Sequence, residues 1–506
     1  MTNKAIRTYA NEHGGRVMIL ILLFLLALYQ LFTSGFPAFA IICTIPVILL
    51  AVIAAFHHQM LTFWLLIVIN YILQWHNIKL PSGIPMSMYN EMLEIVLIAL
   101  AIIEMKDTKI ERLGNIMFFT LIIWGCYCTL EVLNDTCDLG INVGAWYSGA
   151  RMMSFQLIYC FIVFTLYISD PKILIKYLYV WGVLALFASI WVGKQRYIGF
   201  TDAENSWLHG AGSTTHIIQN GTLIRYFSIF GDSANFGIGI ASTAVAFIIF
   251  GITAKITKHK VFFLIVGFAC AWAMFPSGTR TAIACLMAGF MAYIFLSKSI
   301  KIAIPFSIVF GIFVFILAFT NIGQGNQQIR RMRSAFNKND ASANQRTINQ
   351  ETMRKYMKEA PWGIGLGMGD NVPKNNKYWL MSRIPPDSEY VYIWLRTGVI
   401  GLTTFLILTA IMIGGACWIV FFTLKSPSLR GIGAGLCCAM VSQQLGGYGN
   451  QVLMQFPNCL TFYGGLTIVY ILPHIEKEWI EYENKLLMAQ KEKKRLKLEK
   501  KRESRV

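Results

Sequence analysis

Long runs of apolar residues, separated by short polar segments, recur along almost the whole chain. Each run approaches the ~20 residues that an α-helix needs to cross a bilayer. Because lipid offers no partner for backbone N–H and C=O groups, we expect these runs to be helices. The predicted spans lie near 17–33, 37–56, 60–75, 90–105, 116–133, 152–169, 173–193, 233–254, 260–276, 279–297, 299–320, 390–422, 430–447 and 453–472. The pattern predicts an all-α, polytopic integral membrane protein with about 12–14 transmembrane helices.

Composition agrees with this fold class. Of the 506 residues, 56% are hydrophobic and only 14% are charged, and the mean hydropathy is +0.54. These values exclude an ordinary soluble domain. We find no sequence repeat, so we expect one transmembrane domain over 1–472 and a basic tail over 473–506. The first span resembles a signal peptide, but its length and the second span that follows at once favour a retained anchor.

The distribution of Lys and Arg predicts the topology. With a cytoplasmic amino terminus, short inside loops carry most of the basic residues, among them Lys172, Lys176, Lys255 and Lys258. The positive-inside rule therefore places both termini in the cytoplasm. The net charge of +18 would suit nucleic acid, yet eleven of the 44 Lys and Arg lie after Leu472 and no nucleic-acid motif accompanies them. We expect membrane lipids as partners of this tail, and no nucleic acid.

Three polar segments share the outer face in this topology. The largest, 321–389, carries 11 Lys and Arg against 6 Asp and Glu, and we expect a helix over 343–359, capped at Ser342 and ended by Pro361. Residues four apart on this helix form a cationic stripe that includes Arg346 and Arg354. The segment 194–232 and the short turn at 276–280 lie on the same face. Each segment contains arginine near a helix end.

Arg280 and Arg225 are candidate anion-binding residues. Arg280 follows a Ser-Gly-Thr turn and opens a strongly apolar helix, and Arg225 lies shortly before another predicted span. Either arginine can be an interfacial anchor whose charge reaches the headgroups. The alternative is an anion clamp, because a guanidinium presents a fixed fork of donors suited to phosphate oxygens. The repetition of arginine at several outer helix ends favours a shared anionic ligand.

Acidic residues stand at the start of two predicted spans. Asp387 and Glu389 precede one span, and Asp232 precedes another, with Asn235 in its first turn. Such carboxylates can cap a helix and favour its dipole. A carboxylate beside a membrane cavity can also act as a general base on a hydroxyl. Neither the histidines nor the cysteines show metal-ligand spacing, so we expect no metal and no cofactor.

Four places in the sequence resemble the O-antigen ligase and O-antigen polymerase group of membrane glycan-transfer enzymes. At the end of the large loop, members show a His, a small polar residue, nine variable positions and then GxxG. The same spacing is found here from Asp387 and Ser388, through nine residues, to Gly398-Val399-Ile400-Gly401, with Asp in place of His. The stretch from Arg346 to Gly367 resembles the family's Arg-containing helix followed by Pro and GxGxG. SGTR at 277–280 is similar to its SGSR, and IRYFSIFGDSANFG is loosely similar to its R…G…F…PN segment.

The resemblance implies an enzyme of the bacterial inner membrane. Its substrates would be an undecaprenyl-diphosphate-linked oligosaccharide and a glycan or lipid acceptor whose hydroxyl is glycosylated, in O-antigen or capsular polysaccharide assembly. The residues it implies are Asp387 and Arg280 as catalytic groups, Arg225, Arg280, Arg346, Arg354 and Arg396 for the diphosphate, and Ser388, Glu389, Asp232 and Asn235 in support. The enzyme would be polymerase-like or ligase-like, and Asp387 in place of His suggests a polymerase-like member.

A transporter or flippase for a lipid-linked or anionic solute is the main alternative. Transporters place polar sites near the bilayer midplane on interrupted helices, usually across internal repeats. The polar residues here gather at one surface, and no repeat is found. A scaffolding component of a polysaccharide assembly complex is a third possibility.

Overall fold

A computed structural model describes residues 58–78, 86–103, 109–218, 223–298, 341–368 and 371–503, with isolated positions in 18–33 and 304–333. Contacts divide the chain into two compact units, Met1–Trp64 and Leu65–Val506. The second unit contains every candidate site residue and is described here by itself. The predicted spans 17–33, 37–56 and 299–320 fall largely outside the described residues.

The described part is helical, as the apolar pattern predicts. Every predicted span from 60–75 to 279–297, and from 390–422 to 453–472, coincides with a helix. These helices are α4 (Gln59–Ile72), α5 (Ser87–Ile103), α6 (Ile116–Leu130), α8 (Gln156–Tyr167), α9 (Pro171–Tyr197), α12 (Ser233–Thr253), α13 (Thr257–Ala273), α14 (Arg280–Leu296), α19 (Glu389–Trp418), α20 (Pro427–Gly449) and α21 (Asn458–Glu503). Six helical stretches of the described part are long and apolar enough to cross a membrane. The prediction of an all-α polytopic membrane protein is confirmed.

Short elements connect these helices. They are η1 (Ile110–Leu113), η2 (Glu131–Leu133), α7 (Val143–Ala150), the π-helical turn η3 (Arg151–Phe155), α10 (Asp202–His209), α11 (Ser213–His216), η4 (Phe275–Ser277), α17 (Ala341–Met357), α18 (Trp379–Arg383) and the π-helical turn η6 (Ile419–Thr423). The sheet of the described part is a two-stranded hairpin of β1 (Ile217–Ile218) and β2 (Leu223–Ile224), with Ile217 opposite Ile224.

The core of the second unit is built around α12. This helix packs against α13, α14 and α20, and most of its residues are buried. Glycines permit the close approach of α20, because a Cβ at Gly435 would lie 2.5 Å from the ring of Phe250, and one at Gly446 would lie 2.4 Å from Ile238. Small residues at such contacts are typical of helix packing in membranes. The buried α12 therefore fixes the position of the loops at both of its ends.

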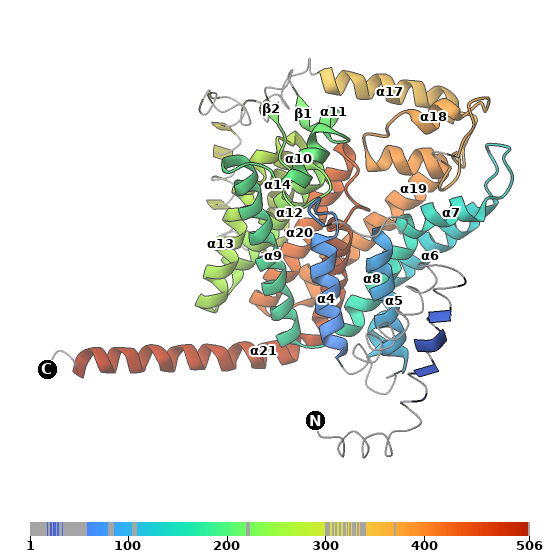
Figure 1. The fold of residues 1–506 in the computed structure, drawn as a ribbon. Helices are drawn as coiled ribbons and strands as arrows, with labels where there is room; N and C mark the ends of the chain where they lie inside the picture. Colours follow the sequence, from blue (N-terminus) through green and yellow to red (C-terminus); the bar gives the residue numbers. More distant parts are fainter. Residues whose placement is uncertain are drawn as a thin grey trace. The chain divides into compact units, whose positions relative to one another are not determined.

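The polar elements α10, α11, α17 and α18 gather at one end of the second unit (Figure 1). We call it the loop end. At the opposite end, the tail end, α21 leaves the helices as a long extension. The helices α12, α14 and α19 begin at the loop end, and α20 ends there.

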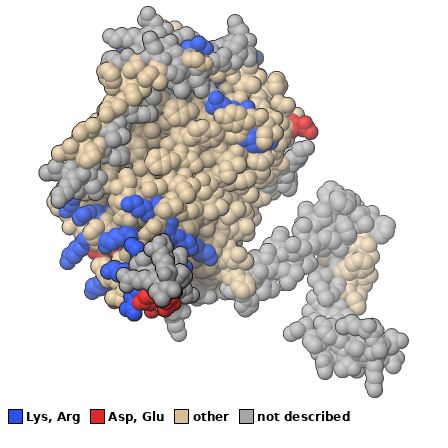
Figure 2. All heavy atoms as spheres, turned by 90° about the vertical axis from the view of Figure 1, so that its left-hand side faces the viewer, with Lys and Arg blue, Asp and Glu red and all other residues tan. Residues whose placement is uncertain are grey.

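The outer surface of α9 and α13 carries exposed apolar side chains, among them Val183, Ile190, Ile265 and Phe268. These two helices pack against each other. Figure 2 shows the corresponding face, with a broad area of residues other than Lys, Arg, Asp and Glu above a group of Lys and Arg at its lower end. An apolar band with a basic border is the surface expected of a membrane-embedded protein.

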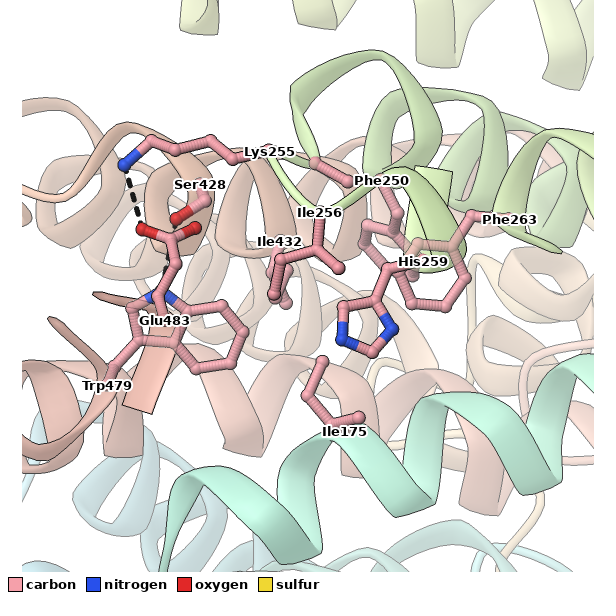
Figure 3. Close-up of a pocket in the computed structure, with 11 residues that line it drawn as sticks. Ile175, Phe250, Lys255, Ile256, His259, Phe263, Ser428, Ile432, Trp479 and Glu483 are labelled. Atoms are coloured by element: carbon pink, nitrogen blue, oxygen red, sulfur yellow. Dashed lines mark hydrogen bonds and ion pairs between the residues drawn. The ribbon is translucent and has the colours of Figure 1, made fainter. Parts of the chain in front are cut away.

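The basic tail is docked on the tail end by specific contacts. Trp479 Nε1 donates to Ser428 Oγ at 3.1 Å, and Lys255 Nζ pairs with the buried Glu483 at 2.7 Å (Figure 3). The carboxylate of Glu476 accepts the amides of Lys425 and Ser426 at 2.7 Å each. The first part of the tail is therefore a packed element and not a free extension.

The polar segments 194–232 and 321–389 contain more order in their described parts than their composition suggests. Thr201 and Glu204 form a capping box that starts α10 within the Gly- and Ser-rich segment 194–232. The helix predicted over 343–359 is confirmed as α17. Its predicted cap is wrong, because α17 begins at Ala341 and Ser342 lies inside its first turn.

Candidate functional site

The amino end of α12 is fixed by Asp232, as the capping interpretation predicts. Its carboxylate accepts the amides of Ala234 at 2.7 Å and Asn235 at 2.9 Å. Burial raises the pKa of Asp232, while these two amides and the charge of Arg225 act in the opposite direction. Asp232 thus has a structural role that accounts for its position before the span.

Asn235 ties α12 to the loop that joins α20 and α21. Its Nδ2 donates to the backbone oxygen of Phe456 at 2.7 Å, and Asn458 Nδ2 donates to its backbone oxygen at 3.0 Å. Asn235 and Asn458 are both buried. The amide pair therefore holds the carboxyl end of this loop against the first turn of α12.

Arg225 bridges the hairpin and the SGTR turn. Its guanidinium donates to Thr215 O at 3.1 Å, to Thr279 Oγ1 at 3.1 Å and to Ser277 O at 3.4 Å. Thr279 in turn donates to Ser233 O at 2.8 Å. The two sequence segments that resemble the family's arginine motifs are therefore in direct contact.

The SGTR turn lies against the start of α12. A Cβ at Gly237 would lie 2.4 Å from Ser277 Oγ and 3.0 Å from Thr279 Cβ, so the glycine permits this close approach. Gly278 has a φ of +58°, a conformation that favours glycine. Arg280 follows as the first residue of α14 and is half-buried. The turn thus brings the amino ends of α12 and α14 together.

Three residues at the amino end of α19, Asp387, Ser388 and Glu389, lie in different surroundings. Ser388 Oγ donates to Gly447 O at 3.0 Å. Glu389 is 2% exposed, and its carboxylate accepts the Leu453 amide at 2.9 Å. Asp387 is half-buried, and the described part of the chain offers its carboxylate no hydrogen-bond donor. Ser388 is the N-cap residue of α19, but its side chain makes no capping hydrogen bond, and Glu389 in the first turn braces another loop.

The loop 450–457 is the common neighbour of these residues, and sequence reasoning missed it. Besides its bonds to Glu389 and Asn235, Gln451 donates to Pro386 O at 2.9 Å, and Asn450 donates to Thr281 Oγ1 at 3.2 Å. The loop thereby joins the starts of α12, α14 and α19. A signal was present, because the polar residues Asn450, Gln451 and Asn458 stand where the apolar runs 430–447 and 453–472 meet.

His216 is a second residue that sequence reasoning set aside. Its Nε2 accepts the Ser233 amide at 3.0 Å, so this nitrogen is unprotonated, and Nδ1 lies 3.2 Å from Gly212 O. Burial and the nearby charge of Arg225 lower the pKa of His216 to about 3. The ring stays neutral at physiological pH and braces α12 beside Arg225. Its role depends on tertiary contacts that no spacing in the sequence reveals.

Arg346, Arg354 and Arg396 belong to another part of the loop end. The end of α17 packs through Met353 and Met357 into a hydrophobic cluster with residues of α18 and α19. This leaves Arg354 exposed and Arg346 half-buried on α17. The Arg396 guanidinium lies 5.3 Å from the Tyr392 ring. The predicted cationic helix therefore exists and packs beside the start of α19.

The two glycine motifs meet each other. Gly398 has a φ of +68°, and a Cβ there would lie 1.9 Å from Pro361 O. Gly363 has a φ of +79° and faces the backbone of Arg396. The GxGxG loop also bonds α19, because Gly365 N donates to Arg396 O at 3.0 Å. Only glycine permits this approach of the large loop to a kinked α19.

The site offers two kinds of positive charge, arginine side chains and the positive ends of helix dipoles. No group of three or more His, Cys, Asp and Glu in the described residues is arranged to hold a metal ion. The starts of α12 and α14 present their positive dipole ends at the loop end together with Arg225 and Arg280. Such an arrangement stabilises an anion.

A comparison with protein-family models matches residues 263–406 to the family described as O-antigen ligase. The matched segment contains the SGTR turn, α17, both glycine motifs and Asp387. It ends before the loop 450–457 and begins after Arg225. No curated protein matches the chain.

Proposed function

Residues 263–406 match the O-antigen ligase family, which confirms the resemblance, and on that premise we propose that the chain is a polymerase-like glycosyltransferase. It transfers an undecaprenyl-diphosphate-linked glycan to an acceptor hydroxyl. The match itself supports the coarser statement of a membrane role in glycan transfer for O-antigen assembly. The donor, the acceptor and the polymerase-like reaction are our proposal.

The observation that carries the proposal is the contact of Arg225 with the SGTR turn of Arg280. When the glycosidic bond to the diphosphate breaks, negative charge grows on the leaving oxygen. Fixed guanidinium groups and helix dipoles stabilise charge that develops in the transition state. Arg225 is held by three acceptors on two elements, and Arg280 opens α14 beside it. We assign both arginines to the diphosphate.

The acceptor hydroxyl must lose a proton during transfer. Of the two carboxylates at the start of α19, Glu389 is occupied by the 450–457 loop, whereas Asp387 has no donor among the described residues. We therefore assign Asp387 to orient or deprotonate the acceptor, with Glu389, Ser388, Asp232 and Asn235 as positioning residues. Arg346, Arg354 and Arg396 would attract the anionic donor to the loop end.

The proposed orientation follows from the same assignment. The loop end faces the periplasm, where lipid-linked repeat units are joined, and the tail over 473–506 lies in the cytoplasm beside anionic headgroups. Labelling of single cysteines introduced at Asn205 and Lys491 by a membrane-impermeant reagent checks this. Labelling of intact cells at Asn205 alone is expected, and labelling at Lys491 would contradict the orientation.

The function is tested with purified protein in liposomes that contain undecaprenyl-diphosphate repeat units. We expect a ladder of glycan products from the wild type, and none from Arg280→Ala or Asp387→Asn. Arg495→Ala is the matched control, because Arg495 lies exposed on the tail and pairs only locally with Glu499. Transport of the lipid-linked glycan without new glycosidic bonds would instead support a flippase.

A further inference from the structure

A cavity of about 610 Å³ opens between the outer end of α6, the turn η2 and the kinked part of α19. Tyr127 and Glu131 line one wall, Asn134 and Asp135 line another, and Trp362 and Ile400 close it. Its volume lies within the range of about 300–1,000 Å³ that ligand pockets occupy. Trp362 and Ile400 belong to segments that resemble the family's motifs, and the other four of these residues do not.

The charge of this cavity differs from that of the arginine site. Two of its lining residues, Glu131 and Asp135, are acidic, and none is Lys or Arg. A diphosphate would be repelled at such a place. Carboxylate oxygens instead accept hydrogen bonds from hydroxyl groups. The cavity therefore suits a ligand that is rich in hydroxyls and carries no negative charge of its own.

Two aromatic rings provide the apolar part of the cavity. Tyr127 and Trp362 are stacked with their centroids 6.4 Å apart and an interplanar angle of 23°. Trp362 is 51% exposed, although it belongs to the loop that packs on α19. A flat aromatic surface beside carboxylate groups matches the two sides of a sugar ring, its C–H groups and its hydroxyls.

The cavity is braced by hydrogen bonds between its walls. Asn134 Nδ2 donates to Glu131 Oε2 and to Trp362 O, both at 2.8 Å, and Tyr127 OH donates to Thr397 O at 3.0 Å. Glu131 is 6% exposed. These bonds join α6 and η2 to the GxGxG loop and α19 across more than 200 positions of sequence. The polar groups are thus held in place before any ligand arrives, as specific binding requires.

We infer that this cavity is a glycan subsite, which binds neutral or amino sugars of the acceptor chain. The inference rests on the proposed function for the identity of the chain that it binds. The diphosphate and the acceptor sugars then bind at separate places. Arginines hold the diphosphate, and an acidic, aromatic cavity holds the sugar hydroxyls.

Two substitutions test the subsite in the liposome assay, with the soluble repeat-unit oligosaccharide added as the acceptor and its concentration varied separately from that of the lipid-linked donor. Trp362→Ala removes the aromatic surface, and Glu131→Gln replaces a carboxyl group in the cavity wall by an amide. We expect each to raise the KM for the acceptor glycan about tenfold or more, with the KM for the lipid-linked donor unchanged. Trp418→Ala and Glu481→Gln are the controls, because Trp418 is exposed at the other end of α19 and Glu481 lies on the tail.

A second measurement separates this inference from the proposed function. Saturation-transfer NMR with the soluble repeat-unit oligosaccharide, without any lipid-linked donor, reports binding in the absence of turnover. Binding by the wild type that is lost in Trp362→Ala supports the subsite even if no transfer is observed. Transfer by the wild type with an unchanged acceptor KM and unchanged oligosaccharide binding in both variants would overturn it.

Discussion

At the scale of single residues, the site is held together by side chains that bond to the backbone of distant segments. Arg225 donates to two backbone oxygens and one hydroxyl, Glu389 accepts an amide of the 450–457 loop, and His216 accepts the amide of Ser233. Each of these contacts joins segments that are well separated in the sequence. The proposed catalytic groups Arg280 and Asp387 are placed by such neighbours.

Replacing Arg225 by Lys tests whether the planar fork matters as well as the charge. A lysine has one nitrogen and cannot reproduce donation from three nitrogens in fixed directions. We expect Arg225→Lys to lower kcat about tenfold or more and to lower the midpoint of thermal unfolding slightly. Arg495→Lys serves as the control. Wild-type turnover in Arg225→Lys would contradict the role assigned to the guanidinium.

The depressed pKa of His216 predicts a dependence of stability on pH. Between about 3 and the ordinary value of 6.5, the unfolded chain binds a proton that the folded chain does not. The free energy of unfolding therefore falls as the pH drops from 6.5 toward 3, because His216 takes up a proton in the unfolded chain and not in the folded one. Above pH 6.5 the ring is neutral in both states, and this loss is absent. Thermal unfolding followed from pH 7.5 to pH 4.5 is expected to show a smaller loss in His216→Gln than in the wild type. Equal losses would show that His216 does not carry the effect.

At the scale of elements, the kink in α19 explains the GxxG motif. Gly398 combines a φ of +68° with a Cβ position 1.9 Å from Pro361 O, so any side chain would push the large loop away. We expect Gly398→Ala to cost about 2 kcal/mol or more of stability. Gly414→Ala in the same helix is the control, because no described atom lies within 4 Å of a Cβ there. Equal unfolding midpoints for the two variants would contradict this reason for the motif.

A buried ion pair joins α5 to the π-helical turn η3. Arg151 NH1 lies 3.4 Å from Glu91 Oε2, and both side chains are less than a tenth exposed. Arg151→Ala leaves a buried carboxylate without its partner, which typically costs about 3–5 kcal/mol. We expect the double variant Arg151→Leu with Glu91→Leu to recover most of the unfolding midpoint. A double variant as unstable as Arg151→Ala would show that the pair itself is not the source of the loss.

Elements were easier to predict than their contacts. Apolar runs give helices directly, because the membrane leaves the backbone no other arrangement, and the Asp232 cap follows from its neighbours in sequence. The cap at Ser342 was misplaced because several residues there suit a helix start equally well. The 450–457 loop was missed because its role lies in bonds to Asn235, Glu389 and Thr281, which no local pattern encodes.

At the scale of the whole molecule, the loop end brings together two chemically different places. Arg225, which follows β2, contacts the turn that precedes Arg280 at the start of α14, whereas the end of α6, η2 and the kinked part of α19 form an acidic, aromatic cavity. The order of motifs along the chain indicated a shared face but not this division. A cavity made by Glu131 and Trp362 can be found only once α6 and α19 are seen to pack together.

We propose above all that the chain forms glycosidic bonds. This proposal is tested most directly by incubating purified protein in liposomes with undecaprenyl-diphosphate repeat units and measuring glycan length together with released undecaprenyl diphosphate. We expect a ladder of products, one undecaprenyl diphosphate released for each bond formed, and loss of both in Arg280→Ala but not in Arg495→Ala. Unchanged repeat units, or a ladder that persists in Arg280→Ala, would contradict it.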